Sequence, residues 1–96
     1  MKYTYPVVFF KDRDGVTGVF PDLEYMAICA DNLKEAVEVA AEYLEEHILD
    51  CMEEGIPMPE AMKSMQVDVE EIAEIVYCEG GTYTEAVVLD ITAAIE

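Results

Sequence analysis

The chain has 96 residues, which fits one small domain and leaves no room for two. Its 22 acidic residues stand against five lysines and arginines, and the formal net charge of −17 repels the phosphates of a nucleic acid. Direct binding to DNA or RNA is therefore not expected. The same charge attracts a basic protein partner, although solubility alone is an equally simple explanation for it.

No feature directs the chain to a membrane or to an oxidising compartment. Its beginning lacks the apolar region of a signal peptide, and no apolar run approaches the ~18 residues of a membrane helix. The three cysteines, Cys29, Cys51 and Cys78, show no zinc or CxxC spacing, and their odd number indicates free thiols. We therefore expect a cytoplasmic protein with no metal and no cofactor.

Three strands are predicted in the first third of the chain. Residues 3–10 are rich in aromatic and β-branched types, and Pro6, which lacks an amide donor, places the early part of this strand at an edge or at its start. Residues 11–15 form a polar turn closed by a glycine. The second and third strands are predicted at residues 16–20 and 26–30.

A long helix is predicted next. Asn32 and Glu35 have the spacing of a capping box, with Asn32 as the N-cap. Gly55 suits the position just after the helix, and Pro57 prevents the helix from continuing. Between these ends the apolar residues recur every three or four positions and define one face: Leu33, Val37, Ala40, Leu44, Ile48 and Met52.

The last third of the chain is less regular. Residues 72–78 are predicted to form a fourth strand, with Gly80 and Gly81 as a turn. Residues 85–95 fit a strand, or a helical turn near their end. The predicted order is β-β-β-α-β with a short C-terminal element. This is an α+β fold in which an antiparallel meander carries the long helix on one face.

Several short motifs occur in order within the first two thirds of the chain. They are the Tyr5-Pro6 start, the glycine-containing hairpin, Val19-Phe20-Pro21-Asp22-Leu23, Asp31-Asn32-Leu33-Lys34-Glu35-Ala36 and Gly55-Ile56-Pro57-Met58-Pro59. In this combination the chain resembles the HicB-like antitoxin family. The resemblance implies a partial ribonuclease H-like fold. It also implies a protein that binds and blocks HicA, a small basic ribonuclease toxin that cleaves messenger RNA.

The resemblance also bears on domain organisation. Many members of the family carry a C-terminal DNA-binding domain, but here the residues after Pro59 contain a single lysine, Lys63, and no basic helix. We therefore expect one HicB-like domain over residues 1–96 and no separate DNA-binding domain. Its core is expected at residues 3–79, and residues 80–96 form a C-terminal extension.

The chain departs from the family pattern at two turns. Glu24-Tyr25 stand where the family usually has Pro-Gly, and Ala30 stands where it usually has Gly, so the loop shapes and the toxin pairing are expected to differ. The surface around the first turn, together with the edge of the first strand, is where we expect a partner to bind. The candidate contact residues are Tyr5, Phe20, Pro21, Asp22, Glu24 and Tyr25. Strand alternation would place about half of the aromatic ones in the core instead.

The late apolar segment is the candidate for self-association. Residues 86–91 are apolar on both faces, and Asp90 is their only charge. Such a segment is costly to expose. We expect it to be buried against its own sheet or, preferably, across the interface of a dimer or tetramer. The candidate interface residues are Tyr83, Val87, Val88, Leu89 and Ile91.

Catalytic signals are weak. Asp12, Asp14 and Asp22 could form the carboxylate cluster with which ribonuclease H enzymes bind Mg²⁺, but each also suits a turn or a strand end. His47, the only histidine, is expected on the helix surface or in a subunit interface. No nucleophile, phosphate-binding or zinc motif is present. No catalytic residue is assigned, and no enzyme activity is expected.

Three functions remain open. The first is an antitoxin-type module that neutralises a small basic HicA-like toxin by direct binding. The second is a solitary homo-oligomeric HicB-like binding or scaffold protein without a toxin. The third is a residual Mg²⁺-dependent nuclease. A neighbouring gene for a small basic protein separates the first from the second, and an RNA cleavage assay tests the third.

Overall fold

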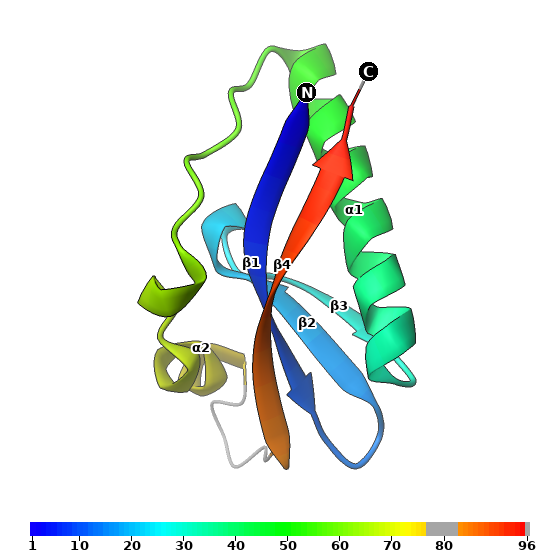
Figure 1. Cartoon of the computed structure of the whole chain (residues 1–96), viewed down its shortest axis with the longest axis vertical. Coiled ribbons are helices and arrows are strands. Elements are labelled where there is room, and N and C mark those ends of the chain that lie inside the picture. Colours follow the sequence, from blue (N-terminus) through cyan, green and yellow to red (C-terminus); the bar gives the residue numbers. More distant parts are fainter. Residues whose placement is uncertain (77–82, 96) are drawn as a thin grey trace.

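The protein is an α+β domain built on one four-stranded antiparallel sheet (Figure 1). A computed structural model describes residues 1–76 and 83–95. The strands lie in the order β3-β2-β1-β4. The elements along the chain are β1 (Lys2–Lys11), β2 (Val16–Phe20), the 3-10 turn η1 (Pro21–Leu23), β3 (Met26–Ala30), α1 (Leu33–Glu54), the 3-10 turn η2 (Ser64–Gln66), α2 (Val69–Val76) and β4 (Glu85–Ala94).

The long central strand β1 organises the sheet. It pairs with β4 over ten positions, from Lys2 to Lys11, but with β2 over only four, from Val8 to Lys11. Pro6 therefore lies in the half of β1 that has a strand on one side only, where a missing amide donor costs least. This confirms the expectation that the early part of the strand has a free edge.

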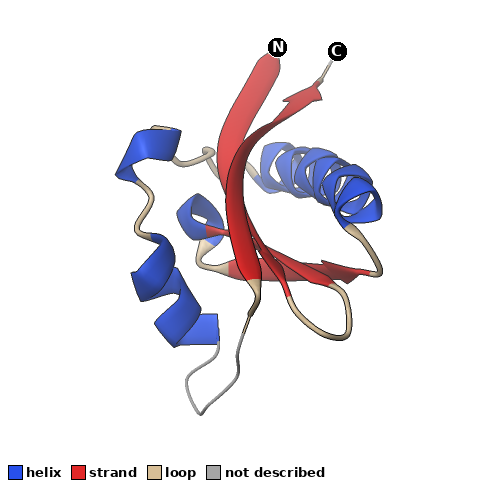
Figure 2. Cartoon of the chain, turned by 60° about the horizontal axis from the view of Figure 1, so that its bottom comes forward, coloured by secondary structure: helices blue, strands red, loops and turns tan. Residues whose placement is uncertain are grey.

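Helix α1 covers one face of the sheet (Figure 2). Its N-terminus is capped as predicted, because the side chain of Asn32 accepts the amide of Glu35 at 2.9 Å. Gly55 ends it in the left-handed conformation, with φ of 72°, and the amide of Ile56 bonds to the carbonyl of Cys51 at 2.8 Å. The face that it buries against Tyr5, Val7 and Phe9 of β1 consists of Ala36, Ala40, Leu44, Ile48 and Cys51.

The second face of the sheet is covered by α2, where the sequence wrongly predicted a strand at residues 72–78. Asp68 caps this helix, because its carboxylate accepts the amide of Glu71 at 3.1 Å. Ile72 and Ala73 are buried in a second cluster with Val8, Phe10 and Val19 of the sheet. The helix ends at Val76, and the remainder of the predicted strand, with Gly80 and Gly81, lies outside the described residues.

The ambiguous late segment is the strand β4. It is strand throughout Glu85–Ala94, so the helical turn considered near its end is not formed. Its side chains alternate between the two faces of the sheet. Val87, Leu89 and Ile91 join the cluster under α1, and Val88 joins the cluster under α2. Tyr83, just before the strand, packs edge-to-face on Phe10 with ring centroids 5.0 Å apart.

Candidate partner-binding groove

The structure divides the expected partner-contact residues into core and surface. Tyr5 and Phe20 are 3% and 0% exposed, so they support the surface from below and do not present a side chain to a partner. Pro21 and Asp22 are half-buried, and Glu24 and Tyr25 are exposed. The accessible part of the set therefore lies on η1 and on the turn that follows it.

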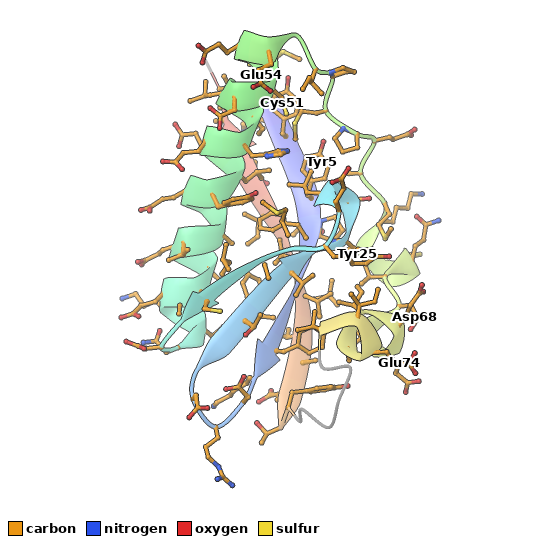
Figure 3. All side chains as sticks on the ribbon, turned by 180° about the vertical axis from the view of Figure 1, so that it is seen from behind. Tyr5, Tyr25, Cys51, Glu54, Asp68 and Glu74 are labelled. Carbon is orange, nitrogen blue, oxygen red and sulfur yellow. The ribbon has the colours of Figure 1, made fainter. Side chains whose placement is uncertain are left out.

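Two of these residues, Asp22 and Glu24, form one wall of a groove of about 730 Å³ together with Leu23 and Met26. The other wall is the C-terminal half of α1 and the extended segment after it. Figure 3 shows Cys51 and Glu54 on this part of α1, and Tyr5 beside it on β1. We call this feature the acidic groove. It is lined by Asp22, Leu23, Glu24, Met26, His47, Asp50, Cys51, Glu54, Ile56, Pro57 and Pro59.

Hydrogen bonds with Tyr5 and Asp22 hold the extended segment in place as a wall. The hydroxyl of Tyr5 donates to the carbonyl of Pro59 at 2.5 Å. The carboxylate of Asp22 accepts the amide of Met62 through both oxygens, at 3.2 and 3.3 Å. Asp22 therefore fixes the backbone at Met62, and Tyr5 fixes the extended segment to the central strand β1. Burial, and then the charge of Asp22, raise the pKa of Tyr5 above its usual 10.0.

This arrangement predicts a loss of stability at alkaline pH. Burial also raises the pKa of Tyr43, so both tyrosines stay neutral in the fold while the unfolded chain ionises first. Their contribution is complete below pH 10.0 and decreases as the pH rises through their folded pKa values. The melting temperature should therefore fall as the pH rises above about 10. It should fall less steeply in Tyr43→Phe, and an equal slope in that variant would contradict this origin.

The floor of the groove contains a histidine–cysteine pair. The imidazole Nε2 of His47 lies 3.7 Å from the Sγ of Cys51, and the ring stacks on Tyr43 with centroids 6.0 Å apart. Tyr43 in turn contacts Phe20 at 5.6 Å. Within residues 1–76 and 83–95, no group of three His, Cys, Asp or Glu side chains is placed to hold a metal ion. Through Tyr43 and Phe20, the histidine–cysteine pair connects the groove to the core.

The charges of the groove have one sign. Its carboxylates come from Asp22, Glu24, Asp50 and Glu54, and its lining residues include no lysine or arginine. Among them, Glu54 opposes the helix dipole, because it lies in the last turn of α1, which carries no basic residue. Each unfavourable charge costs about 0.3–1 kcal/mol of helix stability.

The comparisons with known proteins address the fold. No protein-family model and no curated protein matches the sequence. Two solved structures are similar over 98% of this chain. A chain of a toxin–antitoxin complex from Streptococcus pneumoniae is 20% identical with a TM-score of 0.86, and 70% of that chain is covered. A chain of a HicA3 and HicB3 toxin–antitoxin complex is 22% identical with a TM-score of 0.63, and 99% of it is covered.

The chain has the fold of these two proteins. The likeness agrees with the resemblance to the HicB-like antitoxin family seen between Tyr5 and Pro59, and it extends beyond that stretch over α2 and β4. The described part of this HicB-like fold contains no helix long and apolar enough to cross a membrane.

One departure from the family pattern has a structural cost in this HicB-like fold. Glu24 and Tyr25, where the family usually has Pro-Gly, adopt left-handed backbone angles, with φ of 58° and 60°. Such a conformation costs a side-chain-bearing residue on the order of 1 kcal/mol or more. At this turn the side chain of Glu24 points to the acidic groove and forms part of its lining.

Glu24→Gly should therefore stabilise the protein by about 0.5–1 kcal/mol, because relief of strain outweighs the greater freedom of glycine in the unfolded chain. Glu24→Ala is the matched control, since it removes the same carboxylate and keeps the strained backbone. Urea unfolding of the three proteins gives the comparison. Equal stability of the two variants would show that the turn is not strained.

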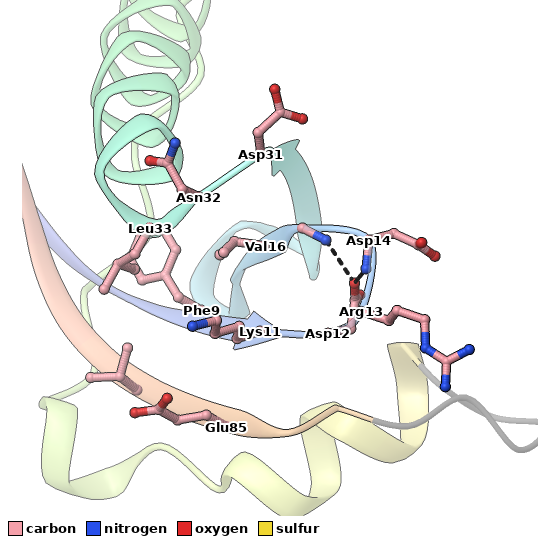
Figure 4. Close-up of a pocket in the computed structure, with 12 residues that line it drawn as sticks. Phe9, Lys11, Asp12, Arg13, Asp14, Val16, Asp31, Asn32, Leu33 and Glu85 are labelled. Atoms are coloured by element: carbon pink, nitrogen blue, oxygen red, sulfur yellow. Dashed lines mark hydrogen bonds between the residues drawn. The ribbon is translucent and has the colours of Figure 1, made fainter.

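A second, smaller cleft of about 460 Å³ lies at the tip of the β1–β2 hairpin (Figure 4). Asp12 and Asp14 line it, together with Lys11 and Arg13, so its charges are mixed. The carboxylate of Asp12 accepts the amides of Asp14 at 2.8 Å and Gly15 at 3.0 Å, the local turn bonding that suits an aspartate there. Asp22 lines the acidic groove instead, so the three aspartates do not form one cluster.

One wall of the acidic groove, on η1, was predicted from the sequence, and the other wall, on α1, was not. His47, Asp50, Cys51 and Glu54 are spaced by three or four along α1, which places them on one side of the helix. That spacing was visible in the sequence. The expectation that His47 lies at the surface of the helix holds in part, because it is half-buried. Of the cysteines that the structure describes, Cys29 is exposed and Cys51 is buried.

Proposed function

We propose that this protein is an antitoxin-type binding module, which neutralises a small basic HicA-like ribonuclease toxin by direct binding through its acidic groove. The observation that carries the proposal is the fold, shared over 98% of the chain with chains from two toxin–antitoxin complexes. The acidic groove supports it independently, because a concave surface with four carboxylates suits a basic ligand. Neutralising a toxin that attacks messenger RNA places the protein in the cytoplasm.

The acidic groove binds the toxin in two steps. The net charge of −17 draws a basic protein toward the surface and speeds the encounter at low salt. An arginine or lysine of the toxin then enters between Glu24 on one wall and Asp50 and Glu54 on the other. Its aliphatic stem packs on the apolar part of the lining, which includes Leu23, Met26 and Ile56. Burial of this contact slows dissociation.

Binding, without catalysis, is what the groove chemistry supports. The thiol of Cys51 is buried, and the candidate base that it contacts, His47, lies on its own helix. The carboxylate of Asp22 is engaged by the amide of Met62. A group that reacts with RNA needs access to the phosphate, which the surrounding carboxylates repel. We therefore propose that the protein acts by covering a toxin.

Co-expression with the product of a neighbouring gene for a small basic protein tests the proposal. The two proteins should co-purify, and the affinity should fall as the salt concentration rises. The toxin alone should cleave RNA, and the complex should not. Failure of the two proteins to associate at low salt would contradict the proposal. A solitary homo-oligomeric protein is the second candidate, favoured by the unpaired edge of β4.

A further inference from the structure

Among residues 1–76 and 83–95, no strand pairs with the outer edge of β4. This strand is the last in the order β3-β2-β1-β4. Met1 and Ile95 exchange two backbone hydrogen bonds of 2.7 Å, which fixes the alternation along the β1–β4 ladder. The odd-numbered residues of β4 therefore bond to β1. The amides and carbonyls of the even-numbered residues point outward: Ala86, Val88, Asp90, Thr92 and Ala94.

This edge lacks the devices that usually protect one. Its register with β1 is continuous over ten positions, so no bulge twists it away. It contains no proline and no lysine, and its only charged residues are Glu85 and Asp90. The opposite edge, β3, is half as long, with five residues. A long, regular and nearly uncharged edge is a template for another strand.

We propose that a second copy of this chain pairs with β4 in antiparallel orientation, which joins the two sheets into one of eight strands. Pairing about Leu89 uses the outward groups, because it sets Val88 opposite Asp90 and Ala86 opposite Thr92. Glu85 then faces Ala93, so no carboxylate faces another across the new ladder. On the α1 side the two Leu89 side chains meet.

A second copy suits this edge better than a basic partner does. The stretch from Ala86 to Leu89 has no charge with which to attract a cation. The carboxylates that suit a basic partner lie in the acidic groove, on η1 and α1. The two surfaces therefore serve different partners, and pairing along β4 leaves the acidic groove free.

Salt distinguishes the two interactions. Two protomers, each with a charge of −17, repel one another, and salt screens that repulsion. Self-association should therefore tighten as salt rises from about 0.05 to 0.5 M, whereas binding of a basic protein weakens. Sedimentation equilibrium of the whole chain at both salt concentrations measures the first effect.

Asp90→Pro tests the proposed edge. Asp90 is exposed and its amide points away from β1, so proline removes an outward donor while the ladder to β1 stays complete. Asp90→Ala is the matched control, with the same change of charge and an intact amide. We expect Asp90→Pro to weaken the dimer at least about tenfold, and Asp90→Ala to leave it equal or tighter.

Hydrogen exchange measures the protection of amides along the same edge in the unmodified protein. This test does not depend on whether the proline variant folds. In the dimer the amides of Val88 and Asp90 should be protected as well as those of Leu89 and Ile91, and dilution should release only the first pair. A protein that is monomeric at both salt concentrations would overturn the proposal. So would a dimer that Asp90→Pro leaves intact, or outward amides that become protected only when a basic protein is added.

Discussion

Reversing three carboxylates of the acidic groove, in the triple variant Glu24→Lys, Asp50→Lys and Glu54→Lys, should weaken binding of a basic toxin by about 100-fold or more. The groove would then present cations where it now presents carboxylates on both walls. A loss of that size corresponds to about 2.7 kcal/mol, which is modest for several charge pairs at one interface. Surface plasmon resonance or titration calorimetry against the co-expressed toxin measures it.

The control for this variant separates position from total charge. Glu38→Lys, Glu42→Lys and Glu45→Lys make the same change of charge on exposed positions of α1 that do not line the groove. The control triple should lose affinity several-fold, mainly through a slower association rate. Equal losses in the two triples would show that net charge alone attracts the partner. The groove triple should also melt no lower, because Glu54→Lys places a cation at the end of α1.

Phe20→Ala should cost about 3–5 kcal/mol of unfolding free energy, enough to leave the domain barely folded. Phe20 is completely buried at the end of β2, where it packs against Tyr43. Its removal leaves a cavity beneath the acidic groove that the sheet and α1 cannot easily close. Urea unfolding measures the change.

Tyr25→Ala is the comparison for this second variant. Tyr25 is 40% exposed on the same stretch of chain, so its truncation should change stability by no more than about 0.5–1 kcal/mol. If Phe20→Ala were as stable as Tyr25→Ala, the core placement of Phe20 would be incorrect, and its side chain would again be a candidate for direct contact with a partner.

The sequence predicted those elements whose local signals agree with one another. The helix α1 has an Asn32 cap, an apolar face and a glycine–proline exit, and the cap and the exit recur in the structure. The predicted face is only partly correct, because Ala40, Leu44 and Ile48 are buried but Leu33 and Met52 are exposed, and Ala36 and Cys51 are buried as well. At α2 the signals conflict. Ile72, Ile75 and Val76 favour a strand by type, but their spacing of three and four fits a helix. Asp68 and Glu71 repeat the capping box of Asn32 and Glu35, and that signal decides in favour of the helix.

The candidate site could be predicted only in part, for a physical reason. The wall on α1 follows from helical periodicity, which is local. The contact of that wall with η1 depends on how α1 lies across the sheet, and no local pattern specifies that crossing. Alternation along β1 indicates that either Tyr5 or Pro6 faces α1. It cannot show that the hydroxyl of Tyr5 reaches the carbonyl of Pro59, 54 residues later.

The pairing of β1 with β4 has a consequence for biosynthesis. The strands meet across at least 74 residues of chain, from Lys11 opposite Glu85 outward. At about 5–20 residues per second, β1 waits on the order of 4–15 s after its own synthesis before β4 exists. During that interval the half of β1 before Val8 has no strand partner at all. Another copy that supplies its own β4 can occupy the vacant place, so exchange of β4 between neighbouring nascent chains is the misfolding route that this topology favours.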